Sequence, residues 1–440
     1  MKPYDESDPE SIEEFGMRLV GKTLREVTGS SIGGRFKGKG KLGQLVEELY
    51  FGYSPNSKSE PDFPKAGVEL KTSPLKFVRG KLVSKERLVL NIIDYNQEGK
   101  FSFEKSSFWV KNGLLLLLFY LHDPSKIDID LIFKICRLWK YPEADLKIIR
   151  DDWQKIVTKI REGKAHLLSE GDTLYLAACT KGSTAASSMR TQPYSTSKAK
   201  QRAFSLKSKY LNYIIDGSLQ RQSDLVVKDT RKYRNGETFE ELVESRFSPF
   251  YGKTVQEIEH ELHITLPNSK HKYYLLAKSI LGVQKDRIAE FEKADIELKT
   301  IRLKKNNRPK ESMSFKQIRF MEIVNETWET SYWLETLTKR FFFVVFGLDQ
   351  EEELRLRKVF FWAMPVKDLE VARKFWEDTK KKITEGNHSD FIKESDARIC
   401  HVRPKAKDSS DRMMAPSGRE EKKMAYWLNS MYIKEVIENS

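Results

Sequence analysis

An acidic residue, a short gap and a Glu-x-Lys triplet stand close together in the first quarter of the chain, at Asp62, Glu69 and Lys71. Val68 and Leu70 alternate with the charged residues of the triplet, which is the period of a β-strand with one buried face. On such a strand Glu69 and Lys71 project from the same face. A lone triplet of this kind is more often an ordinary amphipathic edge strand, so its neighbours decide its meaning.

The residues between the acid and the triplet predict how Asp62 reaches it. Pro64 and Gly67 indicate a turn, from which Asp62 can approach Glu69. Two carboxylates about one strand apart form a hard oxygen site suited to Mg²⁺. The ion would stabilise charge on a scissile phosphate and lower the pKa of an attacking water. Lys71 would orient or deprotonate that water, or neutralise the pentavalent phosphorane, so the set favours metal-dependent cleavage of DNA.

The sequence also contains an internal duplication. The tetrapeptide Glu-Leu-Lys-Thr occurs at residues 69–72 and again at 297–300. Other paired segments follow in the same order in both halves: 21–27 with 252–258, 107–110 with 331–334, 153–163 with 376–386, and 203–211 with 425–433. Because chance does not keep five blocks in order, we predict two lobes of one fold. The expected division is a catalytic lobe at 1–216, a linker at 217–233 and a second lobe at 234–440.

Short apolar runs alternate with amphipathic stretches in each half. This pattern predicts an α/β (α+β) fold in which each lobe is a mixed sheet flanked by helices. The longest apolar run, Leu114–Leu121, is interpreted as a buried strand, since it is too short to span a membrane. The acidic first residues have no apolar core, so no signal peptide is expected. Three widely spaced cysteines indicate neither a disulfide framework nor a zinc site, and a reducing cytoplasm fits them.

The charge of the chain points to its partner. A net charge of +14 and an isoelectric point near 9.3 favour a polyanion, most often nucleic acid. Basic loops lie late in each half, at 180–183 and 190–194 and at 403–407, and such loops can read base edges or hold phosphates. We therefore predict double-stranded DNA as the partner, with no membrane contact. The DNA-binding residues expected are Lys181, Arg190, Gln192, Arg403 and Lys405.

Four segments of the first half carry a specific resemblance: 43–47, 51–53, 56–63 and 67–72. They closely resemble the MutH family of DNA endonucleases, which contains a mismatch-repair nickase and type II restriction enzymes that cut at GATC. The resemblance runs from about residue 21 to 211, and the second half carries it more faintly, in 328–331 and 402–406. It implies the restriction-endonuclease core, a mixed sheet with flanking helices and a DNA cleft.

The resemblance also implies roles for single residues. Asp62, Glu69 and Lys71 take the family's catalytic positions, and Lys111 maps to an additional catalytic lysine on a later strand. The alternative for Lys111 is a solvated lysine at a strand edge. A glutamate on a helix would complete the Mg²⁺ site with Asp62 and Glu69. The Gly-Gln-Leu-Val-Glu pattern places it at Glu47, whereas counting back from Gly52 favours Glu48.

The second lobe departs from this set. Glu297 and Lys299 survive, but Glu290 stands where Asp62 is expected and Glu335 where Lys111 is expected. The helix glutamates are replaced by Ala277 and Lys278. A lost metal ligand and a cation exchanged for an anion should abolish cutting there. We therefore expect the second lobe to bind DNA without cleaving it.

These observations predict a type II restriction endonuclease that hydrolyses double-stranded DNA at GATC with Mg²⁺. Two alternatives remain open: a mismatch-repair nickase of the same family and a catalytically silent DNA-binding protein. Tandem lobes favour the restriction enzyme, because the repair enzyme has one lobe. A restriction enzyme also implies a companion DNA methyltransferase that acts on the same sites and need not bind the chain. A dimer induced by DNA is left open.

Overall fold

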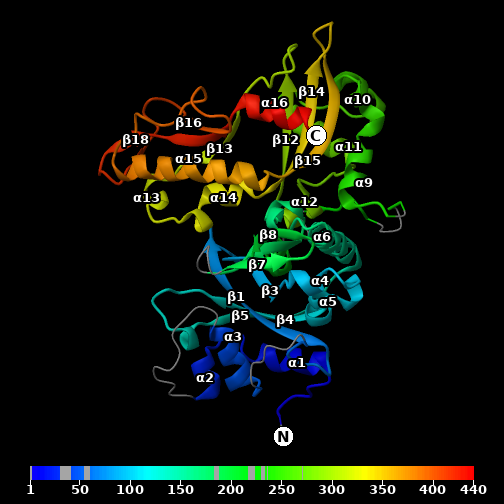
Figure 1. Ribbon diagram of the computed structural model, residues 1–440, viewed down its shortest axis with the longest axis vertical. Coiled ribbons are helices and arrows are strands. Elements are labelled where there is room, and N and C mark those ends of the chain that lie inside the picture. The colour runs from blue at the N-terminus through cyan, green and yellow to red at the C-terminus, as the bar shows by residue number, and fades with distance from the viewer. Residues whose placement is uncertain are drawn as a thin grey trace. The chain divides into compact units, whose positions relative to one another are not determined.

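The computed structural model describes residues 2–29, 41–53, 60–182, 188–216, 223–228, 233–234, 236–269 and 271–440. Parts of the expected linker, the motif residues 54–59 and Ser183 of a predicted DNA-binding loop lie outside these ranges. The chain divides into two compact units. The first comprises residues 1–234 together with 285–295, and the second comprises 235–284 and 296–440 (Figure 1).

The first unit is built on a mixed four-stranded sheet in the order β2-β1-β4-β5. Strands β1 and β4 run parallel, and the outer pairs are antiparallel. The strands are β1 (Val68–Val78), β2 (Lys81–Ser84), β4 (Leu114–Leu121) and β5 (Phe133–Lys140). The predicted buried strand is thus confirmed as β4, whose middle residues are fully buried. The helical segments at the start of the unit are α1 (Pro9–Met17), α2 (Leu24–Thr28), α3 (Lys41–Leu45) and η1 (Val46–Tyr50).

A second layer of the first unit is a three-stranded antiparallel sheet in the order β3-β9-β6, against which the long helix α6 packs. Its strands are β3 (Leu88–Ile92), β6 (Leu176–Thr180) and β9 (Arg202–Leu206), and β7 (Met189–Gln192) and β8 (Ser195–Lys200) form a separate two-stranded ribbon. The α-helices are α4 (Tyr95–Glu98), α5 (Ser107–Asn112), α6 (Glu143–Arg161) and α7 (Ser208–Ile215). The 3₁₀ turns are η2 (Phe103–Lys105), η3 (Asp128–Asp130), η4 (Ala165–Leu167) and η5 (Glu170–Asp172).

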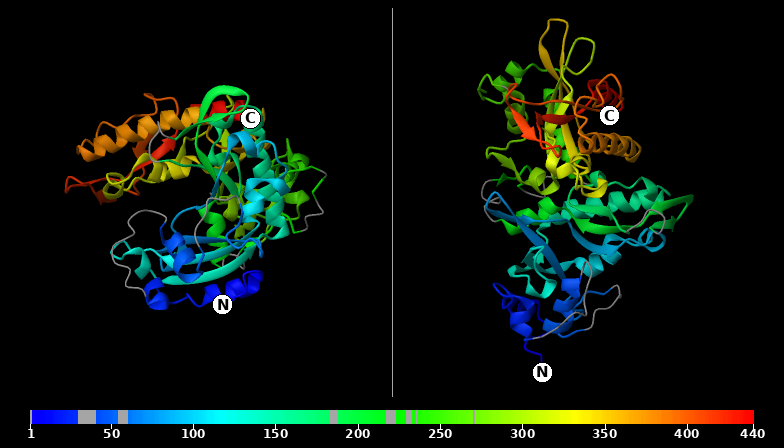
Figure 2. Two further views of the ribbon diagram at one scale, coloured as in Figure 1. Left: turned by 60° about the horizontal axis from the view of Figure 1, so that its bottom comes forward. Right: turned by 90° about the vertical axis from the view of Figure 1, so that its left-hand side faces the viewer.

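The second unit repeats this plan. Its sheets have the orders β12-β14-β15 and β13-β19-β16, with β12 and β14 parallel and β14 and β15 antiparallel (Figure 2). The strands are β12 (Ile296–Leu303), β13 (Met313–Gln317), β14 (Arg340–Leu348), β15 (Leu354–Trp362), β16 (Cys400–Pro404), β17 (Arg412–Met414), β18 (Glu420–Lys422) and β19 (Met424–Leu428). The helical segments are α9 (Phe239–Ser245), η7 (Ser248–Phe250), α10 (Val255–Glu261), α11 (Lys272–Ile280), α13 (Phe320–Ile323), η8 (Trp328–Thr330), α14 (Tyr332–Leu337), α15 (Val366–Thr384) and α16 (Ser430–Glu438).

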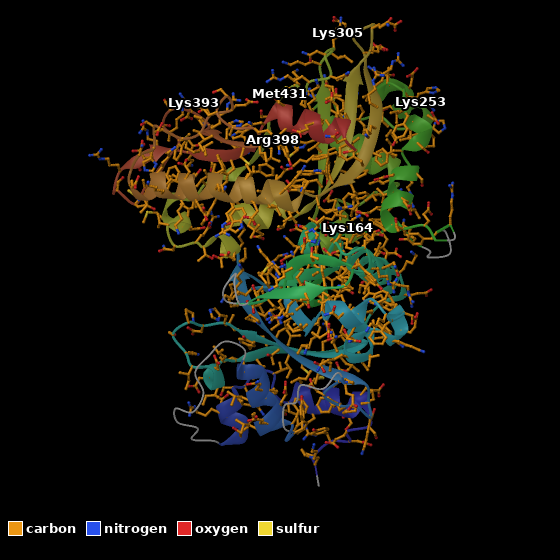
Figure 3. The ribbon with its side chains drawn as sticks, in the orientation of Figure 1. Lys164, Lys253, Lys305, Lys393, Arg398 and Met431 are labelled. Atoms are coloured by element: carbon orange, nitrogen blue, oxygen red, sulfur yellow. The ribbon has the colours of Figure 1, made fainter. Side chains whose placement is uncertain are left out.

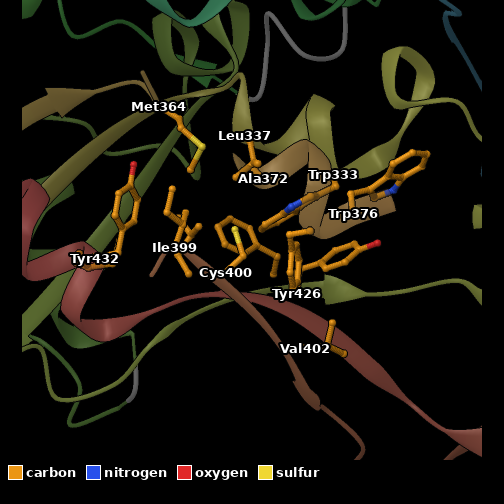
Figure 4. Packing of buried hydrophobic residues seen from close by; sticks show 14 of the residues in the cluster. Trp333, Leu337, Met364, Ala372, Trp376, Ile399, Cys400, Val402, Tyr426 and Tyr432 are labelled. Carbon is orange, nitrogen blue, oxygen red and sulfur yellow. The ribbon is translucent and has the colours of Figure 1, made fainter. Parts of the chain in front are cut away.

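Local signals explain several of the repeated elements. Thr23 caps α2 and Thr254 caps α10, and in each case the glutamate three residues on completes the capping box that the sequence predicts. Inside the second unit Trp333 stacks on Tyr426 with ring centroids 4.6 Å apart, and Leu337 and Ala372 lie in the same buried cluster (Figure 4). The duplication therefore extends from the sequence motifs to the caps of the helices.

One short segment from the second half of the sequence belongs to the first compact unit. Residues 285–295 carry β11 (Arg287–Ile288) and α12 (Ala289–Ala294), and they belong to the first unit. Strand β11 pairs in parallel with β10 (Ser223–Asp224), and α12 packs on α7. Lys293 is 5% exposed, and its Nζ lies 2.6 Å from the Oδ1 atom of the buried Asp145. A cation from this distant segment thus neutralises an acid of the first unit.

Candidate active site

A tight turn places the first acid of the candidate site. Phe63 and Val68 exchange both of their backbone hydrogen bonds, so the chain reverses between them. Gly67 has a φ of +67°, a left-handed conformation that favours glycine. The predicted turn is therefore confirmed, and it brings Asp62 back beside the start of β1.

Hydrogen bonds then join the two acids and the lysine. The backbone N–H of Asp62 donates to Glu69 Oε2 at 3.1 Å, and the N–H of Leu70 donates to Asp62 Oδ2 at 2.9 Å. Lys71 Nζ donates to Glu69 Oε1. Glu69 and Lys71 thus share one face of β1, as their spacing predicts, with Val68 and Leu70 buried on the other.

Lys111 reaches the same carboxylate from an element that the sequence misassigns. Its Nζ lies 3.6 Å from Glu69 Oε1. The expected strand is wrong, because Ser106 accepts a hydrogen bond from the N–H of Trp109 and caps the helix α5. Lys111 therefore sits in the last turn of a helix that leads into β4. The side chain is 16% exposed, which argues against a freely solvated lysine.

The helix glutamate that faces these groups is Glu47. It lies in η1, a π-helical turn, and such turns occur frequently at functional sites. Burial and the nearby Asp62 raise the pKa of Glu47 to about 7, while Lys71 opposes the shift. Glu48, on the next position, is exposed. The geometry favours Glu47 over Glu48 as the third acid of the cluster.

The electrostatic balance of the cluster is negative. Glu69 is 1% exposed, and burial raises its pKa while Lys71 counteracts the effect. Three carboxylates and two ammonium groups leave one net negative charge when all are ionised. Carboxylate oxygens are the ligands that hard divalent cations prefer, and a cation would relieve the repulsion among Glu47, Asp62 and Glu69. The donor set therefore fits a divalent metal ion.

The tightest acidic group lies elsewhere. Within the described ranges, Asp349, Glu351 and Glu353 are the one trio whose carboxylate atoms all lie within 4.8 Å of one another, and the candidate acids are spread more widely. This trio occupies the turn between β14 and β15, where Asp349 accepts backbone N–H bonds from the other two and pairs with Arg355. It is therefore explained as a hydrogen-bonded surface turn.

Tyr53 is a site residue that sequence reasoning missed. Its hydroxyl is buried and has no hydrogen-bond partner among the described residues. Burial raises its pKa far above the usual range, and the neighbouring Asp62, Glu47 and Glu69 add to the shift. The motif residues 51–53 contained this tyrosine, but no spacing in the chain indicates that its hydroxyl lies among the acids.

The corresponding site in the second unit has a different balance of charges. Lys299 Nζ lies 2.7 Å from Glu297 Oε1, and Lys339 Nζ lies 3.6 Å from Glu297 Oε2. Although burial acts to raise the pKa of Glu297, Lys299 and Lys339 outweigh it and hold that pKa below its usual value. Lys339 was not singled out from the sequence, because it lies after α14 and outside the repeated motif.

Two expected replacements in the second unit are wrong in register. Ser331 caps α14 by accepting from the N–H of Leu334, so it corresponds to Ser106 and not to Ser107. Glu335, which is exposed, is then no counterpart of Lys111.

Glu290 is also no counterpart of Asp62. It lies in the segment assigned to the first unit, where its two carboxylate oxygens accept 3.0 Å bonds from the N–H groups of Val226 and Val227. On α11, Lys278 is buried and Ala277 offers no ligand atom, in line with the expected loss of the helix acid.

The predicted DNA-binding residues of the first unit fall into two groups. Lys181 and Arg190 are exposed, and the Arg190 guanidinium donates to Gln201 Oε1. Gln192 is 5% exposed, and its amide bonds the backbone N–H of Ala165 and the carbonyl oxygen of Ser197. Because those contacts occupy Gln192 inside the protein, the assignment of a base contact to it is corrected to a structural role.

Those of the second unit lie on and beside β16. The guanidinium of Arg403 lies 5.3 Å from the ring centroid of Trp427, and Lys405 Nζ lies 5.9 Å from it. Lys405 Nζ also donates to the carbonyl oxygen of Phe315 at 2.6 Å and contacts Ser314 Oγ at 3.1 Å. Both residues therefore form one basic surface over β19 and β13.

Comparison with known proteins places this site in a family. The profile of a family described as DNA mismatch repair enzyme MutH matches residues 51–152 and 282–374. A type II restriction enzyme, Sau3AI of Staphylococcus aureus, is 34% identical over 98% of this chain and 98% of its own length. The DNA mismatch repair protein MutH of Vibrio campbellii is 27% identical over 49% of this chain and 96% of its own length.

The fold and the site define an endonuclease. A buried Glu-x-Lys pair beside a second acid on a mixed sheet is what the sequence predicts for a nuclease module, and the Glu-x-Lys pair and the mixed sheet recur in the second unit. The chain belongs to the MutH family, and its tandem restriction-endonuclease-like architecture is confirmed by the two matched regions. Among the helices that the structure describes, none is long and apolar enough to cross a membrane.

Proposed function

We propose that the chain is a type II restriction endonuclease that uses Mg²⁺ to hydrolyse double-stranded DNA at GATC. The observation that carries the proposal is the convergence of Asp62, Lys71 and Lys111 on the buried Glu69. The full-length similarity to a type II restriction enzyme supports the class of activity. The GATC site rests on the motif resemblance, and Mg²⁺ rests on the oxygen donors of the cluster.

The residues of the site divide the work. Asp62 and Glu69 would hold the divalent cation, with Glu47 as the third acid. When bound, such a cation supplies positive charge at the scissile phosphate and lowers the pKa of the attacking water. Lys71 lies on the same face of β1 as Glu69, where it can orient or deprotonate that water. Lys111 approaches the same oxygen of Glu69 from α5 and would neutralise charge that develops on the phosphate.

We assign cutting to the lobe at 1–216 and DNA binding to the lobe at 234–440. This assignment is supported by the charges at the two sites, since Glu69 has acidic neighbours and Glu297 has lysines. Lys181, Arg190, Arg403 and Lys405 are the residues proposed to contact DNA. We also propose a companion DNA methyltransferase, a dimer that forms on DNA and a location in the cytoplasm.

A mismatch-repair nickase is the second candidate. One observation weighs against it: the repair protein aligns nearly whole with about half of this chain, whereas the restriction enzyme aligns with all but 2% of it. A second lobe has no place in the single-lobe nickase but has one in the restriction enzyme.

Plasmid digestion tests the proposal. Unmethylated and adenine-methylated plasmids are incubated with Mg²⁺ and either the wild type or Lys71→Ala. Discrete fragments that end at GATC, from the wild type alone, are the expected result. Nicks in place of double-strand breaks, or cutting that needs a repair partner, would favour the nickase. Binding without cleavage under any divalent metal would contradict both enzymes.

A further inference from the structure

The second unit gathers lysines where the first unit gathers acids. Lys299 lies two residues after Glu297 on the same face of β12, and Lys339 reaches Glu297 from just before β14. The ammonium of Lys299 also lies 5.6 Å from the ring centroid of Phe315. Lys405 donates to the carbonyl oxygen of that same Phe315, so two ammonium groups meet around one residue of β13.

The two ammonium groups act on each other. Burial lowers the pKa of Lys405, and the charge of Lys299 lowers it further, which places the two cations within electrostatic reach. Lys299 and Lys339 contact the single carboxylate of Glu297, and Lys405 lies near Lys299 beside Phe315. The three ammonium groups and the one carboxylate together carry two net positive charges. Arg403 extends the same basic surface over Trp427.

We propose that this cluster, formed by Glu297, Lys299, Lys339 and Lys405, binds a backbone phosphate of DNA without a metal ion. The proposal rests on the DNA-binding role assigned above to the second lobe, and it names the ligand group and the residues. It also separates the two units chemically, because a metal ion belongs to one and not to the other.

Charge balance supplies the physical argument. The acidic cluster of the first unit carries one net negative charge, so it repels a phosphate until a divalent cation reverses that charge. The lysine cluster carries two net positive charges and attracts a phosphate directly. A divalent cation would meet three ammonium groups and a single carboxylate there, which is too few oxygen ligands for a hard cation.

The role of Glu297 follows from its contacts. The carboxylate holds the ammonium groups of Lys299 and Lys339 through separate oxygens, one on each. It therefore positions the two lysines, while its own charge opposes the phosphate. Replacing Glu297 by glutamine keeps the shape and removes the charge. The variant should bind DNA more tightly, whereas the loss of a ligand from a metal site would weaken binding.

The test is DNA binding by the full chain in EDTA, read by fluorescence anisotropy of a labelled GATC duplex at several salt concentrations. The double variant Lys299→Ala/Lys339→Ala should bind at least about tenfold more weakly, and the slope of log K against log salt should fall by about two. Glu297→Gln should bind more tightly than the wild type. The matched control is Lys305→Ala. Lys305 is an exposed lysine in the turn between β12 and β13, and it pairs with Glu352 (Figure 3).

Two results would overturn the proposal: unchanged affinity and salt slope in the double variant, or weaker metal-free binding by Glu297→Gln. The proposed cleavage is scored separately, by digestion of plasmid with Mg²⁺. Failure of the wild type to cut, with weak binding by the double variant, would refute the enzyme and leave the phosphate site standing. Normal cutting by the wild type with unchanged binding by the double variant would refute the phosphate site alone.

Discussion

Glu69 and Glu297 occupy the same position on the same kind of strand, yet their surroundings shift their pKa values in opposite directions. Each begins a Glu-Leu-Lys-Thr tetrapeptide, and each strand pairs in parallel with the buried strand of its unit. The pKa of Glu69 is raised chiefly by burial, whereas lysines lower the pKa of Glu297 despite its burial. A fold can thus be copied while the charge of one site is reversed.

The difference arises outside the shared tetrapeptide. In the first unit, the turn before β1 delivers Asp62 and the π-helical turn delivers Glu47. In the second unit, the segment just before β12 belongs to the other compact unit, and α11 presents Ala277 and a buried Lys278. The acids proposed to hold a metal ion are therefore supplied by the elements around the motif, and the second unit lacks them.

Replacing each of the two glutamates by alanine should reveal the largest difference between the two units. Glu69→Ala should lower the rate of DNA cleavage by at least about 1,000-fold, because it removes the proposed metal ligand and the partner of two lysines. Glu297→Ala should retain cleavage chemistry, with its effect confined to DNA affinity. Single-turnover cleavage of a GATC duplex at saturating protein measures both. Equal loss in the two variants would erase the distinction between the units.

A second comparison concerns a buried acid that each unit holds near the start of its long helix. Tyr210 donates to Asp145 Oδ2 at 3.0 Å, and Tyr432 donates to Asp368 Oδ2 at 2.9 Å. The cation on Asp145 is the buried Lys293, whereas Arg398, which pairs with Asp368, is 49% exposed.

Removing the two cations should therefore have unequal effects. Lys293→Met leaves Asp145 buried without its cation and should cost about 3–5 kcal/mol, or about 10 °C in melting temperature. Arg398→Met should cost about 1 kcal/mol or less, because water reaches that pair. Differential scanning calorimetry of both variants measures the contrast. A larger loss for Arg398→Met would show that segment 285–295 contributes little to the first unit.

The pH dependence of stability sharpens the electrostatic contrast in metal-free protein. The pKa of Glu47 is raised from 4.5 to about 7, so its contribution to stability is present below 4.5 and is lost as pH rises through 7. The pKa of Glu297 is lowered, so its contribution is present above 4.5 and is lost as pH falls through the folded value. At pH 8, Glu47→Gln should melt a few degrees above the wild type and Glu297→Gln a few degrees below it. Both differences should shrink toward pH 4, and melting curves of the same sign would contradict the assignment.

Local patterns predicted the part of the site that lies on one strand. The alternation of Val68, Glu69, Leu70 and Lys71 has the period of a strand, and a nearby proline and glycine mark the turn. Lys111 shows the limit of such patterns. Its short apolar neighbourhood fits a strand or a helix equally well, and the serine cap that decides the matter lies five residues earlier.

Tertiary contacts explain what the sequence could not predict. Gln192 is a polar residue in a basic loop, but hydrogen bonds to Ala165 and Ser197 hold it inside. Lys339 reaches Glu297 only because β14 lies beside β12, and no spacing in the chain reveals that neighbour. A residue just before one strand can therefore complete a site that belongs to a different strand.

The most direct test of the account is a titration of the full chain with Mn²⁺, followed by electron paramagnetic resonance, in the wild type, Glu69→Ala and Glu297→Ala. Mn²⁺ prefers the same oxygen ligands as Mg²⁺. The wild type and Glu297→Ala should bind the ion alike, and Glu69→Ala should lose at least about tenfold in affinity. Loss of Mn²⁺ binding in Glu297→Ala, with Glu69→Ala unchanged, would contradict it.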